Sequence, residues 1–264
     1  MWRQKDGFAW WNPARVPPCP EDFVTGPPDF VGVGAERAGT SWWYTLITSH
    51  SEIHDPAGRP KEVHFLDPYW LRAMDDPDPG QYAAYFPRPP GQLAGEWTPR
   101  YMFDYWGPAQ LKRAAPGTLV IALLRDPLDR YRSGLTHDLA INSLYMPHVA
   151  DIAAARGLYH QQLVNLLRFF DRDRLLVLQF EQCARDPRAQ LRRTFDFLGV
   201  ADESGSIDIS RVVNKALSPK PDLDQKREAA LLEYYRDDLT RLLELLGPDV
   251  EPALWPTCVR LGLA

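Results

Sequence analysis

Three short apolar runs mark the centre of the predicted fold. They cover residues 30–34, 118–124 and 175–180, and they are apolar almost throughout rather than alternating with polar positions. A continuous apolar run of this length is typical of a strand that is buried on both faces of a parallel sheet. We therefore predict three central strands with helices covering both sides of the sheet.

Segments with helical spacing or helix-boundary signals alternate with these runs. We predict helices over residues 42–49, 127–139, 157–170, 186–198 and 224–246. Pro127 suits the first turn of a helix, and Gly199 suits a C-terminal cap. Residues 56–92 are rich in proline and glycine, which predicts loops with short helices. Strands that alternate with helices predict an α/β fold, a P-loop-like three-layer sandwich with a central, mostly parallel sheet flanked by helices.

Residues 1–28 differ from the rest of the chain because they are rich in tryptophan and proline. Proline denies regular backbone hydrogen bonding there. Two interpretations stay open: an arm laid over the body of the protein, or tryptophans that line a substrate mouth. Residues 29–264 are predicted to form a single domain, since a chain of 264 residues buries a sizeable core.

Composition and charge exclude several functional classes. The net charge is −5 and the pI is about 5.7, which disfavours a protein that works by non-specific nucleic-acid contacts. The sequence has no apolar run of about 18 residues and no apolar region at its start, so we expect neither a membrane span nor a secretory signal. Three widely spaced cysteines fit a reducing cytoplasm. The 24 arginines against six lysines hint at a GC-rich bacterial genome, and nothing indicates an oligomeric state.

The first predicted strand runs into a turn with the glycine spacing of a phosphate-binding loop, GAERAGTS over residues 34–41. Backbone N–H groups at the start of a helix favour a bound anion. A P-loop nucleotide hydrolase or kinase needs lysine directly after the second glycine, where this chain has Thr40. The positive charge stands instead at Arg37. The loop is thus suited to an anion but lacks the lysine that reaches a γ-phosphate.

Several segments, taken together and in order, resemble sulfotransferases that use 3′-phosphoadenosine 5′-phosphosulfate (PAPS). Residues 34–43, G-x-x-R-x-G-T-S-W-W, resemble the 5′-phosphosulfate loop of that family, and residues 121–134 resemble its 3′-phosphate motif. Residues 61–66 (KEVHFL) and 96–101 (EWTPRY) resemble the K-E-x-H-F-F and E-K-T-P-x-Y segments of the bacterial and heparan-sulfate-type branch. The resemblance covers about residues 30–255.

The resemblance implies PAPS as co-substrate and adenosine 3′,5′-diphosphate (PAP) as product. A sulfuryl group carries less negative charge than a γ-phosphoryl group, so we expect no metal. The implied cofactor contacts are Arg37, Ala38, Gly39, Thr40, Ser41, Trp42, Arg125, Ser133 and Lys215.

Each of these contacts has a structural alternative. Arg37 can pair with Glu36, the hydroxyls of residues 40 and 41 can simply cap a helix, and Trp42 can fill core. Arg125 can pair with Asp126 or Asp129. Lys215 lies in a segment that departs from the family pattern, where Arg211 or Lys220 can substitute for it. We expect Arg130 and Arg132 to lie on a solvated face.

The implied catalytic residues are Glu62, Arg37 and His64. Glu62 corresponds to the general base of the heparan-sulfate-type branch, and burial is expected to raise its pKa towards neutral. Alternatively, Glu62 caps a helix or pairs with Lys61. His64 is able to act as the base or as a helper. Arg37 replaces the usual lysine of the family and supplies fixed positive charge, although its pKa is too high for a general acid.

The expected reaction is sulfuryl transfer to a hydroxyl, less favourably an amine, of a small-molecule or carbohydrate-containing acceptor. Glu96 and Thr98 either shape the acceptor cleft or make structural hydrogen bonds. Trp97 stands where the family often has lysine, which disfavours a heparan-like polymer. Residues 67–95 and 138–156 are expected to form the acceptor walls with the aromatics Tyr69, Trp70, Tyr82, Tyr85, Phe86 and Tyr145. Two alternatives stay open: a kinase-like phosphoryl transferase, and a non-catalytic module that binds PAP.

Overall fold

The computed structural model describes residues 15–56, 58–76, 78–141, 147–210 and 222–264. A five-stranded parallel sheet forms its centre, with strand order β2-β3-β1-β4-β5. The strands are β1 (Phe30–Gly34), β2 (Ile53–His54), β3 (Leu93–Trp97), β4 (Leu119–Leu124) and β5 (Leu175–Gln179).

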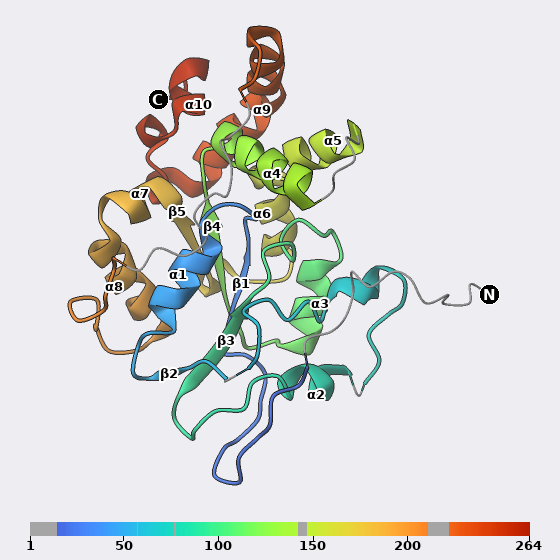
Figure 1. The fold of residues 1–264 in the computed structure, drawn as a ribbon, viewed down its shortest axis with the longest axis vertical. Coiled ribbons are helices and arrows are strands. Elements are labelled where there is room, and N and C mark those ends of the chain that lie inside the picture. The colour runs from blue at the N-terminus through green and yellow to red at the C-terminus, as the bar shows by residue number, and fades with distance from the viewer. Residues whose placement is uncertain (1–14, 57, 77, 142–146, 211–221) are drawn as a thin grey trace.

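Helices cover both faces of the sheet. They are α1 (Thr40–Ile47), α2 (Asp78–Ala83), α3 (Gly107–Ala114), α4 (Pro127–Ile141), α5 (Pro147–Ala155), α6 (Tyr159–Leu167), α7 (Phe180–Arg185), α8 (Pro187–Leu198), α9 (Gln225–Leu246) and α10 (Pro256–Leu261). Four short 3-10 turns are η1 (Asp67–Trp70), η2 (Arg172–Arg174), η3 (Gly247–Asp249) and η4 (Pro252–Leu254). Figure 1 shows α1 and α8 on one face of the sheet and α3 and α6 on the other. The predicted three-layer α/β sandwich is therefore confirmed.

The three predicted strands are β1, β4 and β5, and nearly every residue in them is buried. The strands β2 and β3 were not predicted. In β3 the apolar pattern is broken by Gly95, where an added Cβ would lie 2.4 Å from the carbonyl oxygen of Phe30. The glycine lets the two backbones approach, and Glu96 beside it is a charged residue inside the sheet. A search for continuous apolar runs therefore does not detect this strand.

The five predicted helices correspond to α1, α4, α6, α8 and α9. Asp186 and Asp224 cap α8 and α9, each accepting a hydrogen bond from a backbone N–H three residues later. Gly199 ends α8 in the left-handed conformation, at φ 73°. None of the helices in the described ranges has the length and apolar character needed to span a membrane. A cytoplasmic location and a bacterial source stay predictions from the sequence.

The strand order places one edge of the sheet at the centre of the molecule. From β1 the chain first builds β2 and β3 on one side, then crosses to β4 and β5 on the other. In open α/β sheets, ligands bind beyond the carboxyl ends of the strands at such a reversal. The turns that follow β1, β3 and β4 meet there, and they carry Arg37, Thr98 and Arg125.

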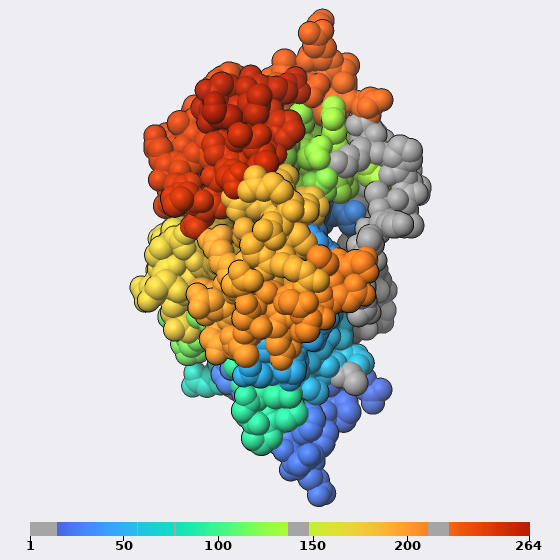
Figure 2. Space-filling model, turned by 90° about the vertical axis from the view of Figure 1, so that its left-hand side faces the viewer, coloured from blue at the N-terminus to red at the C-terminus, as the bar shows by residue number. Residues whose placement is uncertain are grey.

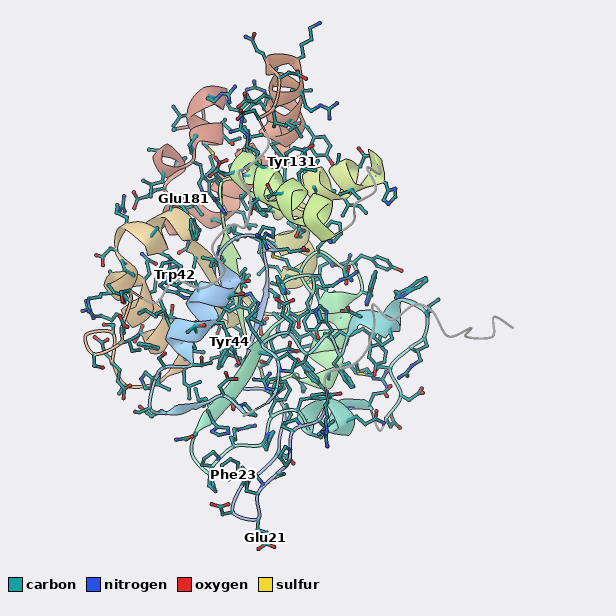
Figure 3. The ribbon with its side chains drawn as sticks, viewed as in Figure 1. Glu21, Phe23, Trp42, Tyr44, Tyr131 and Glu181 are labelled. Atoms are coloured by element: carbon teal, nitrogen blue, oxygen red, sulfur yellow. The ribbon has the colours of Figure 1, made fainter. Side chains whose placement is uncertain are left out.

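The described part of the predicted N-terminal arm, residues 15–28, packs at the other end of the sheet. Val24 and Arg88 exchange two backbone hydrogen bonds of 2.9 Å, and the ring of Phe23 lies 5.1 Å from that of His54. Figure 3 places Glu21 and Phe23 at the end of the molecule opposite Tyr131 on α4. This part of the arm therefore does not border the carboxyl edge of the sheet. Its tryptophans, Trp2, Trp10 and Trp11, lie outside the described residues.

Gly32 in β1 lets a tryptophan pack across the sheet. An added Cβ would lie 1.9 Å from the ring of Trp97, which is completely buried and donates from Nε1 to the carbonyl oxygen of Gly34 at 3.2 Å. We expect Gly32→Ala to lower the free energy of unfolding by about 3 kcal/mol, because the ring has no room to move. Urea denaturation measures this change. Gly80→Ala is the control, since nothing lies within 4 Å of its added Cβ. Equal stability of the two variants would contradict the packing argument.

Candidate active site

The turn between β1 and α1 leaves the start of the helix open to a ligand. Gly39 occupies the N-cap position with φ 90°, and an added Cβ there would lie 2.7 Å from the ring of Phe180. Within the described chain no side chain caps α1, so the first N–H groups of the helix are available to an anion. N-capping therefore does not explain Thr40 and Ser41. Thr40 is buried and Ser41 is half-buried in the first turn of α1.

The two segments predicted to bind phosphate meet in the structure. Arg37 Nε donates to Ser133 Oγ at 3.3 Å, across 96 residues of sequence. Arg125 Nη1 donates to the carbonyl oxygen of Arg37 at 3.4 Å. Arg37 itself takes a left-handed backbone conformation, at φ 67°. The loop after β1 and the turn after β4 thus form one site.

Arg125 is held in place by an aromatic ring and a carboxylate. Its Cζ lies 5.0 Å from the ring centroid of Phe180, and Nη2 lies 3.1 Å from Asp129 Oδ2. The ion pair with Asp129 that was considered as an alternative is therefore present. Nε of Arg125 is buried and has no hydrogen-bond partner among the described residues. A fixed guanidinium with a spare buried donor is suited to a phosphate oxygen.

The turn after β4 is tied to the C-terminal part of the chain. Asp126 accepts hydrogen bonds from the backbone N–H and the hydroxyl of Thr257, at 2.8 and 2.9 Å. Its own N–H donates to Glu181, which also accepts from Trp255 Nε1 at 2.7 Å. Figure 3 labels Glu181 on α7. Burial raises the pKa of Asp126 and of Glu181. The α7 and α10 segments meet in this network, and in Figure 2 α7, α8, α9 and α10 form one continuous face.

Three arginines near the site have surroundings that the sequence analysis either described wrongly or did not consider. Arg130 is completely buried, and its guanidinium donates to the carbonyl oxygen of Ala153. The expectation that it faces solvent is wrong, because α5 and α9 cover this part of α4. Arg132 is half-buried, 3.6 Å from Glu228. Glu36, considered as a partner of Arg37, forms an ion pair with Arg156 at 2.9 Å.

A second cluster lies beside the start of α1 and contains the predicted base. Glu62 Oε1 lies 2.7 Å from Lys61 Nζ, and Glu62 Oε2 lies 3.3 Å from His64 Nε2. The other ring nitrogen of His64, Nδ1, lies 3.0 Å from Asp67 Oδ2. Lys61 Nζ is also 3.4 Å from Thr40 Oγ1, which connects this cluster to the start of α1. The predicted pairing of Glu62 with Lys61 is therefore present.

The expectation that burial raises the pKa of Glu62 is wrong. Burial alone does raise it, but the hydrogen bond with His64 and the charge of Lys61 outweigh that effect, so the pKa lies below its usual value. The side chain is still 35% exposed, so it is accessible to an acceptor. Glu62 is an ionised carboxylate at neutral pH.

His64 has the opposite shift. Burial lowers its pKa, but hydrogen bonds with Asp67 and Glu62 outweigh burial and raise the pKa to about 10. A raised pKa stabilises the fold fully below the unfolded value of about 6.5, and the contribution is lost as pH rises towards 10. We expect His64→Gln to lose more stability at pH 6 than at pH 10, measured by urea denaturation. His148→Gln on α5 is an exposed control. An equal loss at both pH values would contradict the assignment.

The buried carboxyl group of Glu96 fixes the segment that carries the predicted base. Glu96 is completely buried and accepts hydrogen bonds from Val63 N at 3.0 Å, Thr98 Oγ1 at 2.5 Å and Tyr82 OH at 2.6 Å. Thr98 Oγ1 in turn accepts from His64 N at 3.3 Å. Burial raises the pKa of Glu96. Glu96 and Thr98 were expected either to shape the acceptor cleft or to make structural hydrogen bonds. These contacts support the second interpretation.

The remaining residues predicted to contact the cofactor are Ala38, Trp42 and Lys215, and they differ in burial. Ala38 is buried, and Trp42 is half-buried with its ring 5.3 Å from Trp43 and 6.0 Å from Phe180 (Figure 3). Lys215 lies outside the described residues. Sequence reasoning did not assign Phe180 to the site, although it is the last residue of a predicted central strand, at the carboxyl edge.

The aromatic residues expected to form acceptor walls are mostly buried. Trp70 is the exception among those described, at 51% exposed, and the nearby residue Tyr105 is 75% exposed. Tyr145 lies outside the described residues. The buried ones pack in the core, as Tyr82 does against the ring of Phe65, with centroids 5.0 Å apart. Most of the described aromatic residues in this set therefore belong to the core. The buried members are Tyr69, Tyr82, Tyr85 and Phe86.

Comparisons with known proteins agree with this geometry. The family model described as "Sulfotransferase domain" matches residues 27–218. Heparan sulfate glucosamine 3-O-sulfotransferase 6 of Mus musculus is 27% identical over 205 residues, 70% of this chain and 57% of the mouse protein. Its counterpart in Homo sapiens is 25% identical over 256 residues, 84% of this chain and 72% of the human protein. The chain thus spans little more than half of the mouse relative.

A solved structure shows the same fold. The crystal structure of a sulfotransferase from Alicyclobacillus acidocaldarius superimposes with a TM-score of 0.67 at 23% identity, covering 85% of this chain and 98% of that one. Within the described residues, no group of three or more histidine, cysteine, aspartate or glutamate side chains is placed to hold a metal ion.

Proposed function

The chain belongs to the sulfotransferase domain family, and on that premise we propose that it transfers the sulfuryl group of PAPS to a hydroxyl of a small-molecule or carbohydrate-containing acceptor. An amine is the less favoured acceptor group. One observation carries the proposal: the contact of Arg37 with Ser133 joins the loop after β1 to the motif on α4, as binding of one nucleotide with two phosphate ends requires. The family resemblance found in the sequence is confirmed by the family match.

The donor substrate would be held at both ends. The N–H groups of residues 38–41 and the charge of Arg37 are placed for the 5′-phosphosulfate, because they surround the start of α1. Arg125 and Ser133 are placed for the 3′-phosphate. Lys215 belongs to this proposal from the sequence alone. Since no step needs a general acid at Arg37, its role is to stabilise negative charge on the leaving diphosphate.

Glu62 is the general base of the proposed reaction. Its carboxylate is ionised and partly exposed, and it would take the proton of the acceptor hydroxyl as the oxygen attacks sulfur. His64 is less suited to that task, because its raised pKa keeps the imidazole protonated at neutral pH. His64 instead orients Glu62 through Oε2 and is itself held by Asp67.

The acceptor is inferred to be less densely charged than the one named for the relatives, heparan sulfate. The nearby guanidinium of Arg100 is already engaged, with Nε 2.8 Å from Asp104 Oδ2 and Nη1 3.7 Å from Asp67 Oδ2. Trp97, which is uncharged, stands where the family often has lysine, and its ring is buried in the sheet. A neutral sugar or a phenol is better matched to these surroundings than a sulfated polymer.

Two measurements test the proposal. Calorimetry is expected to show binding of PAP, and an acceptor screen with labelled PAPS is expected to show transfer of the label. Binding of PAP without transfer to any hydroxyl or amine would favour a non-catalytic PAP-binding module. Turnover of ATP with Mg²⁺ in place of PAPS would favour a phosphoryl transferase. Absence of PAP binding would reject the proposed function altogether.

A further inference from the structure

Lys61 lies between the start of α1 and the predicted base, and its ammonium group contacts both. Nζ is 3.4 Å from Thr40 Oγ1 and 2.7 Å from Glu62 Oε1. It also donates to the carbonyl oxygen of Trp97 at 3.1 Å, at the carboxyl end of β3. The side chain is only 16% exposed. A desolvated cation therefore stands between the anion site and the group that would deprotonate the acceptor.

We propose that Lys61 is a further catalytic residue, whose ammonium group binds the sulfuryl oxygens while the group passes from PAPS to the acceptor. This inference rests on the proposed function. In that reaction the bond from sulfur to the 5′-phosphate oxygen breaks, and its electron pair leaves with PAP. A bond from sulfur to the acceptor oxygen forms, and the acceptor proton goes to Glu62. Lys61 keeps its proton and supplies fixed positive charge.

The position of Lys61 follows the path of the sulfuryl group. An in-line displacement places the leaving and attacking oxygens on opposite sides of sulfur. The leaving oxygen would lie at the start of α1, next to Thr40, and the attacking oxygen would lie beside Glu62. The sulfur must then sit between these two residues, and Lys61 Nζ contacts both of them.

Three other cations near the site, all within the described residues, make different contacts. Arg37, whose charge is proposed to stabilise the leaving diphosphate, contacts Ser133 on α4 through Nε. Arg125 lies over Phe180 and contacts Asp129. His64 approaches Glu62 at Oε2, whereas Lys61 approaches it at Oε1. Of these four cations in the described part of the chain, Lys61 contacts both Thr40 and Glu62.

One contact of Lys61 is suited to exchange for a sulfuryl oxygen. An ammonium group has three N–H donors, and the three contacts of Lys61 use all of them. The contact with Thr40 is the longest, at 3.4 Å, and it faces the anion site. An N–H···O hydrogen bond is normally about 2.9 Å, so a charged oxygen at the start of α1 would be a better partner than this hydroxyl. Burial lowers the pKa of Lys61, although Glu62 opposes this effect.

Calorimetry with PAPS and with PAP tests the proposal without an identified acceptor. The two nucleotides differ by the sulfuryl group alone. We expect Lys61→Met to weaken PAPS binding about tenfold and PAP binding less than threefold, because a hydrogen bond to a charged group is lost only with PAPS. Lys61→Gln is the second variant, since it keeps an N–H donor without the charge, and it is expected to be intermediate. Lys226→Met on α9 is the exposed control and should leave both affinities unchanged.

Measurements of kcat distinguish a lysine that acts on the sulfuryl group from one that only changes the pKa of Glu62. With an acceptor identified by the screen, Lys61→Met should lower kcat at least thirtyfold at every pH from 6 to 9. Recovery of the wild-type kcat at pH 9 would overturn the proposal, because Lys61 would then act only through the ionisation of Glu62. Equal weakening of PAPS and PAP would overturn it as well. Failure of the wild-type chain to bind PAP would reject the proposed function, and this inference with it.

Discussion

Glu62→Gln is expected to lower kcat for sulfuryl transfer by about a hundredfold to ten-thousandfold, the range that general base catalysis contributes. The amide keeps the shape of the side chain and one oxygen that can accept from Lys61, but its NH2 group meets the donor of the protonated His64, and it cannot accept the acceptor proton. PAP affinity should stay within about twofold of wild type, because Glu62 faces the acceptor side of the site. Initial rates with labelled PAPS and calorimetry with PAP measure the two effects.

Two further variants sharpen this result. Glu62→Asp keeps a carboxylate but withdraws it by one methylene, so it should retain more activity than Glu62→Gln. Glu233→Gln removes an exposed carboxylate on α9, 71% exposed, and should leave the rate unchanged. Full turnover of Glu62→Gln would show that another group takes the proton. Because the charge of Glu62 raises the pKa of His64, NMR titration of the imidazole in Glu62→Gln should give a lower pKa than in wild type.

Arg125→Met is expected to weaken PAP binding about tenfold to a hundredfold, because a charge-assisted hydrogen bond to the 3′-phosphate is lost. Methionine retains most of the packing volume against Phe180. Adenosine 5′-phosphosulfate lacks the 3′-phosphate, so its affinity should change less than threefold in the same variant. The comparison of the two nucleotides by calorimetry locates the effect at one end of the ligand.

A matched control removes an arginine that is far from the site. Arg192 on α8 pairs with Asp202 at 2.8 Å and is 64% exposed, so Arg192→Met should bind both nucleotides as wild type does. An Arg125→Met variant that binds PAP normally would contradict the assignment of the 3′-phosphate site. A variant that loses both nucleotides equally would show that Arg125 acts by supporting the backbone of Arg37, which accepts its 3.4 Å hydrogen bond.

Local sequence patterns predicted the parts of the fold that depend on local physics. The runs that became β1, β4 and β5 are apolar enough to be buried on both faces in any parallel sheet. Asp186 and Gly199 signalled the ends of α8 because caps and left-handed glycines depend on neighbouring residues alone. The strand β3 was not predicted, since Gly95 is explained by its packing against Phe30 and Glu96 by hydrogen bonds that include those from Tyr82 and Val63, and these partners are distant in sequence.

For the candidate site, too, some features could be predicted from the sequence and others depended on the tertiary structure. The sequence by itself determined the family resemblance and led to the prediction of Arg37, Glu62 and Arg125 as site residues, because spacing within short motifs carries that information. Only the tertiary structure decided that Arg130 is buried and that the pKa of Glu62 falls instead of rising. Burial and pKa depend on which groups the strand crossovers bring within a few ångströms, and charge interactions change steeply over that distance. A linear pattern of residues does not contain those distances.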